Sequence, residues 1–462
     1  MRERTQILIA GGGPGGATAA TLLAQQGLEV TVLERDHFPR YHIGESLLPS
    51  LLPVLDSMGA REAVERHGFV RKTGAFYGWG GEEWSLGFDE PQRPAPYSFQ
   101  VVRGEFDHLL LDHARSQGAV VREETSVRRV ELPAGRATEA TWTTQGGREG
   151  STAFRYFVDA SGRAGVLGAR QLGARRFHDA FRNVAAWGYW RGAAPLPAAP
   201  QGAIGVFSLP EDGWLWAIPL HDGTLSVGLV TSKRSFNRAR GQHGSIDAVY
   251  HQALEQSPHL TRILAHARLV TPVKVEGDYS YVSRTFCGEG YFLVGDAACF
   301  LDPLLSTGVH LAMYSGLLSA AAIGSTLRGE VEEDAARRFY QTAYRQAYER
   351  LLILVTAFYR IHDGRDTYFR KAQTLSRRDR AGTRLHESFL NIITGIEDVR
   401  DAREEAVDVL HSRLRGPLPG QPAHGLGGHA TDQMFSLPTS RHHAPGGLFL
   451  ELDPYPRLVP AR

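Results

Sequence analysis

Residues 5–16, TQILIAGGGPGG, decide the fold, because they join a short apolar run to a cluster of glycines. The run over residues 5–10 predicts a buried strand. The Ala- and Leu-rich segment after the glycines predicts a helix to about Gln26, which Gly27 ends. Residues 28–33 (LEVTVL) predict a second strand. The order strand, helix, strand predicts the start of an α/β fold.

The glycine cluster fits the pattern G-x-G-x-x-G through Gly11, Gly13 and Gly16. Small residues let the backbone approach a pyrophosphate, and the helix N-terminus offers free N–H groups and the positive end of a dipole. Glu34 ends the second strand, where a carboxylate can bond ribose hydroxyls. A glycine-rich turn beside an exposed glutamate is the alternative. Strand, helix and acid together favour a dinucleotide site.

Gly295 and Asp296 follow another predicted strand and distinguish FAD from NAD. A flavin carries a long ribityl chain that needs a second anchor, and Asp296 could bond its hydroxyls. Arg40 and Arg103 could neutralise phosphate charge, although single arginines are more often surface salt-bridge partners. The prediction is an FAD site.

Composition sets the broad class of the protein. The 462 residues include 51 basic and 50 acidic ones, and a net charge of +1 argues against a nucleic-acid binder. Two cysteines, Cys287 and Cys299, form no disulfide framework. No apolar run approaches the roughly 20 residues that span a bilayer, and no signal peptide is visible. We therefore expect a cytoplasmic protein of two or three domains without a membrane partner.

The chain divides into four expected regions. Short aromatic and β-branched runs over residues 183–282 predict an antiparallel sheet on the substrate side. Helices are expected over about 308–328 and 333–362. The predicted regions are a discontinuous FAD-binding domain (1–182 and 283–330), the sheet region (183–282), a helical C-terminal region (331–414) and a loop-rich tail or lid (415–462). Four tail histidines lack a convincing metal-ligand spacing, so no metal site is predicted: His424, His429, His442 and His443.

Three further motifs carry a family resemblance. They are residues 43–49 (IGESLLP), Trp214–Pro219 (W-x-W-x-I-P) and residues 300–308 (F-x-x-P-x-x-S-x-G). The chain resembles the FADH2-dependent halogenases, in particular the branch acting on phenols, pyrroles and carrier-bound aromatic acids. The resemblance covers about the first 360 residues and implies a Rossmann-like FAD-binding domain of the flavin monooxygenase type. It also implies a role in natural-product biosynthesis, such as that of antibiotics.

The resemblance implies a catalytic lysine. In the family, reduced FAD and oxygen turn chloride or bromide into hypohalous acid, which passes through a tunnel to a lysine beside the substrate. The matching residue is Lys72, one of four lysines against 47 arginines. An ammonium could polarise the acid, and a neutral amine with a lowered pKa could form a haloamine, whereas arginine stays protonated. The alternative is an exposed strand lysine.

Other residues take roles from the same resemblance. The backbone amides of Thr307 and Gly308, before a predicted helix, are candidates for halide binding, and a Ser/Thr helix cap can coexist with that role. Asp302 is the candidate for covalent flavin attachment, or a turn residue before proline. Trp214 and Trp216 share one strand face and are expected to separate flavin from substrate, unless they simply pack in a core.

Some assignments stay open. Glu45 has no clear role, and the tyrosines at one helix face could shape an aromatic pocket or pack ordinarily: Tyr340, Tyr344 and Tyr348. We see no second dinucleotide motif, so a separate NAD(P)H-dependent flavin reductase is expected. The substrate is expected to be an aromatic small molecule, free or bound to an acyl carrier protein. The rival functions are an FAD-dependent aromatic hydroxylase on the same fold and a catalytically silent flavoprotein.

Overall fold

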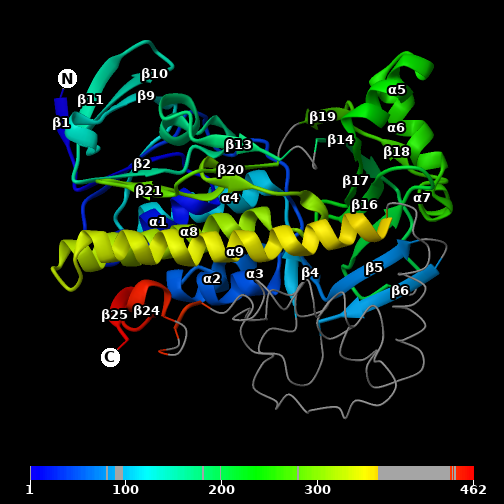
Figure 1. The fold of residues 1–462 in the computed structure, drawn as a ribbon. Helices are drawn as coiled ribbons and strands as arrows, with labels where there is room; N and C mark the ends of the chain where they lie inside the picture. The colour runs from blue at the N-terminus through cyan, green and yellow to red at the C-terminus, as the bar shows by residue number, and fades with distance from the viewer. Residues whose placement is uncertain are drawn as a thin grey trace, which may run out of the picture.

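The computed structural model describes residues 2–79, 82–88, 97–178, 182–197, 199–277, 280–362, 437–439, 441 and 444–461. Within them two large sheets lie side by side, and a long helix runs across both (Figure 1). No helix in this part of the chain is long and apolar enough to cross a membrane.

The first sheet has six strands and carries the glycine motif. Its order is β21 (Cys287–Gly288), β22 (Tyr291–Leu293), β12 (Tyr156–Asp159), β2 (Ile7–Ala10), β3 (Val30–Leu33) and β8 (Val120–Arg122). All neighbours are parallel except β21 and β22. The strands β2 and β3 are buried throughout and apolar except for Thr31, as expected of a parallel sheet covered on both faces.

Helices cover this sheet as the opening motif predicts. The helix α1 (Pro14–Ala24) follows β2 directly and ends two residues before the expected Gln26. It packs against α8 (Gly308–Leu327) so closely that a Cβ on Gly316 would lie 2.6 Å from the carbonyl oxygen of Gly15. The helix α4 (Arg103–Ser116) packs on α1 as well. The α/β class is confirmed.

The second sheet has eight strands. Its order is β18 (Arg268–Leu269), β14 (Asn183–Arg191), β17 (Thr224–Ser232), β16 (Trp214–Pro219), β15 (Ile204–Ser208), β5 (Gly74–Trp79) and β6 (Glu82–Gly87), with β19 (Lys274–Gly277) also on β14. All pairs are antiparallel except β15 with β5. The expected antiparallel sheet is confirmed, and it includes two strands from outside residues 183–282.

Three helices interrupt the region that was expected to form the antiparallel sheet. They are α5 (Lys233–His243), α6 (Ile246–Glu255) and α7 (Pro258–Ile263), and they lie at the outer side of the second sheet (Figure 1). Tyr250 of α6 is fully buried and donates a hydrogen bond to the carbonyl of Val227 in β17. The sequence analysis named no helices in this region, and these three supply apolar cover for this face of the sheet.

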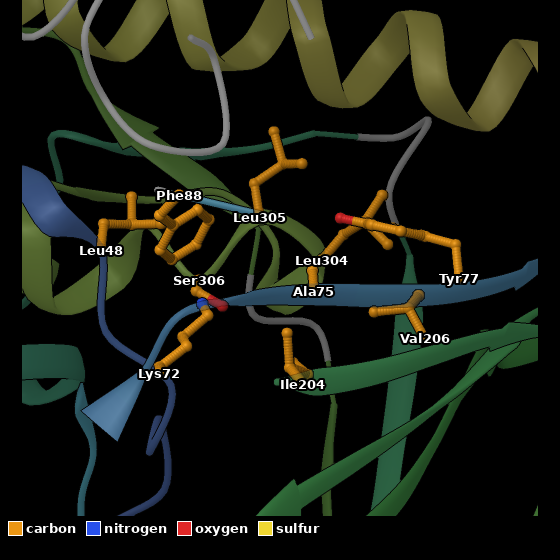
Figure 2. Close-up of a pocket in the computed structure, with 10 residues that line it drawn as sticks. All are labelled: Leu48, Lys72, Ala75, Tyr77, Phe88, Ile204, Val206, Leu304, Leu305 and Ser306. Atoms are coloured by element: carbon orange, nitrogen blue, oxygen red, sulfur yellow. The ribbon is translucent and has the colours of Figure 1, made fainter. Parts of the chain in front are cut away.

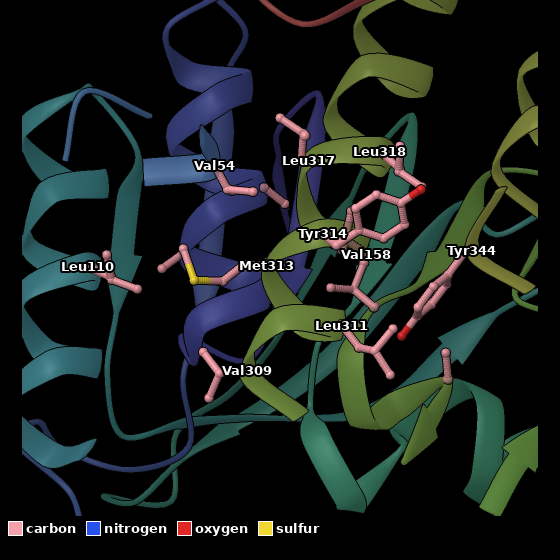
Figure 3. Packing of buried hydrophobic residues seen from close by; sticks show 14 of the residues in the cluster. Val54, Leu110, Val158, Val309, Leu311, Met313, Tyr314, Leu317, Leu318 and Tyr344 are labelled. Carbon is pink, nitrogen blue, oxygen red and sulfur yellow. The ribbon is translucent and has the colours of Figure 1, made fainter. Parts of the chain in front are cut away.

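The long helix α9 (Glu333–His362) and α8 match their predicted ranges. Figure 3 shows α8 inside the buried cluster, with Met313 directed toward Leu110 of α4 and Tyr314 on the side of α9. On α9, Tyr340 and Tyr344 are fully buried and donate hydrogen bonds to the carbonyls of Leu293 and Gly295. These tyrosines, with buried Tyr348, serve helix packing rather than an aromatic pocket.

The C-terminal residues depart from the expected loop-rich tail. Residues 444–461 include the hairpin β24 (Leu448–Glu451) and β25 (Arg457–Pro460), at the end of the molecule away from α5 to α7 (Figure 1). The amide of Leu458 donates to Ser325 of α8. The other predictions for 363–436, and those for the four tail histidines, lie outside the described residues.

The remaining elements form small sheets and short helices. One sheet joins β1 (Arg2–Arg4), β11 (Glu149–Ala153), β10 (Glu139–Thr144) and β9 (Thr125–Glu131), and another β13 (Arg175–Phe177), β20 (Tyr281–Ser283) and β23 (Cys299–Phe300). The strands β4 (Val70–Lys72) and β7 (Ser98–Gln100) pair alone, and α2 (Leu52–Met58) and α3 (Arg61–His67) precede them.

Candidate active site

One cavity of about 810 Å³ takes residues from both large sheets. It brings together most of the predicted site residues: Gly11, Gly13, Glu34, Arg40, Arg103, Trp214, Trp216, Asp296, Thr307 and Gly308. Three predicted residues, Gly16, Lys72 and Asp302, do not line it. We call this space the large cavity.

The three glycines of the motif have different structural roles. Gly11 has φ +104°, and a Cβ there would lie 2.3 Å from the carbonyl oxygen of Ala160. A Cβ on Gly16 would lie 2.0 Å from the oxygen of Gly11, so that glycine serves close packing of helix on strand. At Gly13 a Cβ would meet only an Arg40 nitrogen at 3.2 Å. Gly13 is thus the glycine that keeps the cavity open.

Glu34 is held by the backbone around it. One carboxylate oxygen accepts from the amide of Gly12 at 2.6 Å, and the other accepts from the amide of Asp36 at 2.8 Å. The side chain is buried at the end of β3 and still lines the cavity. This fixes the carboxylate beside the glycine loop, where the dinucleotide prediction needs it.

A buried aspartate that sequence reasoning missed organises the two arginines. Asp107 accepts from Arg103 at 2.8 and 3.0 Å and from Arg40 at 3.1 Å. Burial raises the pKa of Asp107, but the charges of Arg103 and Arg40 outweigh it and hold that pKa below its usual value. Arg103 also donates to the carbonyls of Ile43 and Gly44. The arginines are therefore not surface salt-bridge partners, and the i, i+4 spacing of Arg103 and Asp107 was the available signal.

Asp296 lies in a short 3₁₀ turn, Gly295–Ala297, at the carboxyl end of β22. Burial raises the pKa of its carboxyl to about 6. A carboxyl that is partly protonated near neutral pH can both donate to and accept from hydroxyl groups. This suits the predicted contact with a ribityl chain.

The residues at the large cavity fit FAD. The glycine cradle and the α1 N-terminus suit a pyrophosphate, Glu34 a ribose, and Asp296 a ribityl hydroxyl. Arg40 and Arg103 supply positive charge along the same space.

The N-terminus of α8 also opens onto the large cavity. Gly308 is the first helical residue, and Thr307 before it makes no capping hydrogen bond through its side chain. The first amides of a helix have no acceptor within the helix, and they carry the positive end of its dipole. Ser306 has φ +57°, a left-handed conformation that a serine rarely adopts. The first amides of α8 therefore remain the predicted site for a halide.

Trp214 and Trp216 form part of the cavity wall. They lie two positions apart in β16, with ring centroids 6.0 Å apart, and both side chains are nearly fully buried. Trp216 donates to the hydroxyl of Ser226 at 3.2 Å. A Cβ on Gly228, opposite Trp216 in β17, would lie 2.1 Å from the indole. Gly228 was missed by sequence reasoning, and it makes room for this ring.

Lys72 lines a second, small cavity of about 10 Å³ (Figure 2). Its lining is mostly apolar: Leu48, Ala75, Tyr77, Phe88, Ile204, Val206, Leu304, Leu305 and Ser306. Ile204 and Ser306 line the large cavity too. The two spaces therefore meet at these two side chains, and Lys72 lies beyond them.

The amine of Lys72 is deeply buried. Its side chain is 3% exposed, and Nζ donates to Ser46 Oγ at 2.9 Å and to the carbonyl of Leu47 at 3.1 Å. Burial lowers the pKa of Lys72 to about 7. The alternative of an exposed strand lysine is thus wrong. Both forms of the amine are populated near neutral pH, which is the condition for haloamine chemistry.

Glu45 ends a hydrogen-bonded chain along the large cavity. Tyr189 donates to Glu45 at 2.6 Å, the hydroxyls of Tyr189 and Tyr41 are 3.0 Å apart, and Trp187 donates to Tyr41. Nζ of Lys274 lies 4.2 Å from the centroid of the Tyr41 ring. Burial raises the pKa of Glu45 to about 7. More than 140 residues separate the tyrosines, so no local pattern could have revealed this chain.

Asp302 lies outside both cavity linings. Its side chain accepts from the amide of Leu304, which caps the 3₁₀ turn Pro303–Leu305, and from the side chain of Asn183 at 3.3 Å. The turn role is confirmed. Covalent flavin attachment at Asp302 stays a prediction.

A Rossmann-type sheet with a glycine cradle, facing a second sheet across one long cavity, defines an FAD-binding enzyme. Comparison with known proteins places the chain more narrowly. The family model described as "Tryptophan halogenase" matches residues 6–92 and 87–400, so the chain belongs to this halogenase family. It is a flavin-dependent halogenase and uses FAD, with a halide and oxygen as co-substrates.

The relatives agree with this assignment. A tryptophan 2-halogenase from Chondromyces crocatus is 44% identical over 410 residues, covering 87% of this chain and 78% of the relative. The sulochrin halogenase gedL from Aspergillus terreus is 36% identical over 383 residues, covering 78% and 70%. The solved myxobacterial chondrochloren halogenase CndH has a TM-score of 0.73 and 33% identity, covering 91% of this chain and 98% of its own. The predictions of halogenase activity and FAD are confirmed.

Proposed function

We propose that the enzyme halogenates a phenolic aromatic acid through Lys72, with the acid either free or bound to an acyl carrier protein. The observation that carries the proposal is the position of the Lys72 amine. It lies in a small apolar cavity that meets the large cavity at Ile204 and Ser306. A nucleophilic nitrogen next to, but not inside, the FAD cavity suits a reactive halogen species that must travel a short way.

When bound and reduced, FAD supplies hypohalous acid from oxygen and the halide. The amides at Thr307 and Gly308 hold the halide at the positive end of α8. The indoles of Trp214 and Trp216 keep the substrate apart from the large cavity. The small cavity has room for about one water-sized molecule. Its apolar lining offers few groups that the acid would oxidise.

Lys72 then transfers the halogen. The neutral amine attacks the chlorine of hypochlorous acid, so that an N–Cl bond forms, the O–Cl bond breaks and water leaves. The ring carbon of the substrate takes the chlorine, and its proton returns to the nitrogen. Ser46 and Leu47 accept two hydrogen bonds from Nζ, which a neutral amine can donate while its lone pair stays available. The lowered pKa of Lys72 provides that neutral form near pH 7.

The substrate class rests on the relatives and on ring chemistry. Electrophilic halogen transfer needs an electron-rich ring, and phenols meet that need. Tryptophan is the second candidate, because the Chondromyces relative at 44% identity is a tryptophan 2-halogenase. Enzymes of this family use a separate flavin reductase, and we propose an NAD(P)H-dependent one here.

Product mass decides between these functions. Reactions with reduced FAD, oxygen and chloride would compare free phenolic acids, the same acids loaded on a carrier protein, and tryptophan. We expect one chlorine in place of one hydrogen on a phenolic acid. Chlorinated tryptophan alone would move the proposal to indoles. A gain of oxygen without halogen would instead indicate an aromatic hydroxylase.

A further inference from the structure

A cluster of metal-ligating side chains lies outside both cavities. It consists of His67 at the end of α3, Glu105 in the first turn of α4 and His221 in the turn between β16 and β17. The three residues come from distant parts of the sequence, so no ligand-spacing motif exists. The cluster therefore escaped the sequence analysis, which predicted no metal site.

The ligand atoms already converge. Oε2 of Glu105 lies 2.7 Å from Nε2 of His67 and 3.0 Å from Nε2 of His221, and all three groups fall within 4.8 Å of one another. Bonds of about 2.0–2.1 Å to a tetrahedral metal hold neighbouring ligand atoms roughly 3.4 Å apart. Small rotations of the side chains would bring these atoms to that spacing.

An aromatic side chain holds the two imidazoles in place. The His67 ring stacks on Phe69 with centroids 4.1 Å apart, and the His221 ring meets the same phenyl edge-on at 5.2 Å. Phe69 itself is buried. The rings therefore lose little further freedom when they bind an ion, which favours affinity.

We propose that His67, Glu105 and His221 bind one divalent cation of the zinc class. Two imidazoles and one carboxylate suit such borderline metals, and three protein ligands leave a fourth position for water. The side chains are 30%, 39% and 21% exposed, so an ion and its water can enter from solvent. A plain cluster of two histidines around one carboxylate is the alternative.

Such an ion would fasten three elements together. It would join the α3 end and the α4 start, which belong with the first sheet, to a hairpin of the second sheet. Glu105 follows two residues after Arg103, which lines the large cavity. The role we assign is structural, and it does not depend on the halogenation reaction.

Zinc titration calorimetry on the full-length protein, freed of metal with a chelator, tests the proposal. We expect one Zn²⁺ per chain and a higher melting temperature with zinc, because a ligand that binds the folded state stabilises it. His67→Ala and His221→Ala should each weaken zinc binding at least about tenfold, since even losing a group that supports a ligand costs that much. Glu105→Gln, which keeps the side-chain shape, should weaken zinc binding as well.

A matched control separates this site from the other histidines of the chain. His37 pairs with the carboxylate of Glu123 and belongs to no group of three such ligands in the part of the chain that the structure describes, so His37→Ala should bind zinc as the parent protein does. Circular dichroism confirms that each variant is folded. The proposal is overturned if the parent binds no zinc, or if folded His67→Ala and His221→Ala bind it as tightly as His37→Ala.

Discussion

Lys72 combines burial, two hydrogen-bond acceptors and a lowered pKa, and each property follows from its neighbours. The chain has only four lysines, and a GC-rich genome explains that scarcity. What needs a physical reason is one of them at 3% exposure in an apolar cavity. Burying an amine in an apolar cavity costs stability, so a functional role is the better explanation of its position.

Replacing Lys72 should abolish halogen transfer and leave FAD binding intact. We expect Lys72→Met to lower product formation by roughly 10²-fold or more, as for loss of a catalytic proton-transfer group. Lys72 does not line the large cavity, so FAD fluorescence titration should give an unchanged Kd. The exposed Lys233, far along the chain in α5, gives the control Lys233→Met, which should keep full activity. Halogenation by Lys72→Met at the parental rate would remove the lysine from the mechanism.

The lowered pKa of Lys72 also predicts how stability changes with pH. The amine has a pKa of about 7 when folded and of 10.5 ordinarily, so between these values the unfolded chain binds more protons. The free energy of unfolding must therefore rise with pH across that window. Relative to that of Lys72→Met, the free energy of unfolding of the parent should be lowest below pH 7 and should rise as the pH approaches 10. Melting curves of both proteins from pH 6 to 10 measure this, and a constant difference would argue against a buried amine.

Sequence motifs identified residues that line the two cavities, but not the residues that hold those side chains in position. Gly13, Glu34 and Lys72 stand in local patterns, and the structure places them at a cavity. The contacts of Asp107 with Arg40 and of Tyr189 with Glu45 span 67 and 144 residues, and no local pattern encodes them. A contact between distant segments is decided by how the sheets stack, and only the folded chain shows it.

At the scale of elements, the glycine turn and α1 make a prediction that separates binding from folding. Gly13→Ala adds a methyl group that meets only an Arg40 nitrogen at 3.2 Å, so the protein should fold and bind FAD about tenfold more weakly. Gly16→Ala places a methyl 2.0 Å from a backbone oxygen and should destabilise the fold by about 1–3 kcal/mol or more. Urea unfolding and FAD titration measure the two effects. Equal stability loss in both variants would contradict these separate roles.

The helices α5 to α7 show where element prediction failed and what signal was present. Each begins after a serine whose side chain accepts from the third helical amide: Ser232, Ser245 and Ser257. Serine N-caps of this kind indicate where a helix begins. The aromatic and β-branched runs of this region favoured a prediction of strands. The helices α8 and α9 were predicted almost to the residue, because both are long.

At the scale of the whole molecule, the two sheets keep FAD and the lysine in adjoining spaces that meet at Ile204 and Ser306. A larger side chain there should block passage between the cavities. We expect Ile204→Phe to consume reduced FAD normally but to give several-fold less halogenated product per FAD oxidised. Ile204→Ala, the matched change in the other direction, should keep most of that yield. Equal yields from both variants would show that the halogen takes another route.

The most direct measurement follows the halogen onto the protein. The enzyme would turn over with reduced FAD, oxygen and radioactive chloride but no aromatic substrate, then be desalted and digested. The account predicts label on the peptide that contains Lys72, no label in Lys72→Met, and transfer of the label to product when a substrate is added. Product labelled at the parental rate with no label on Lys72, or label retained by Lys72→Met, would contradict it.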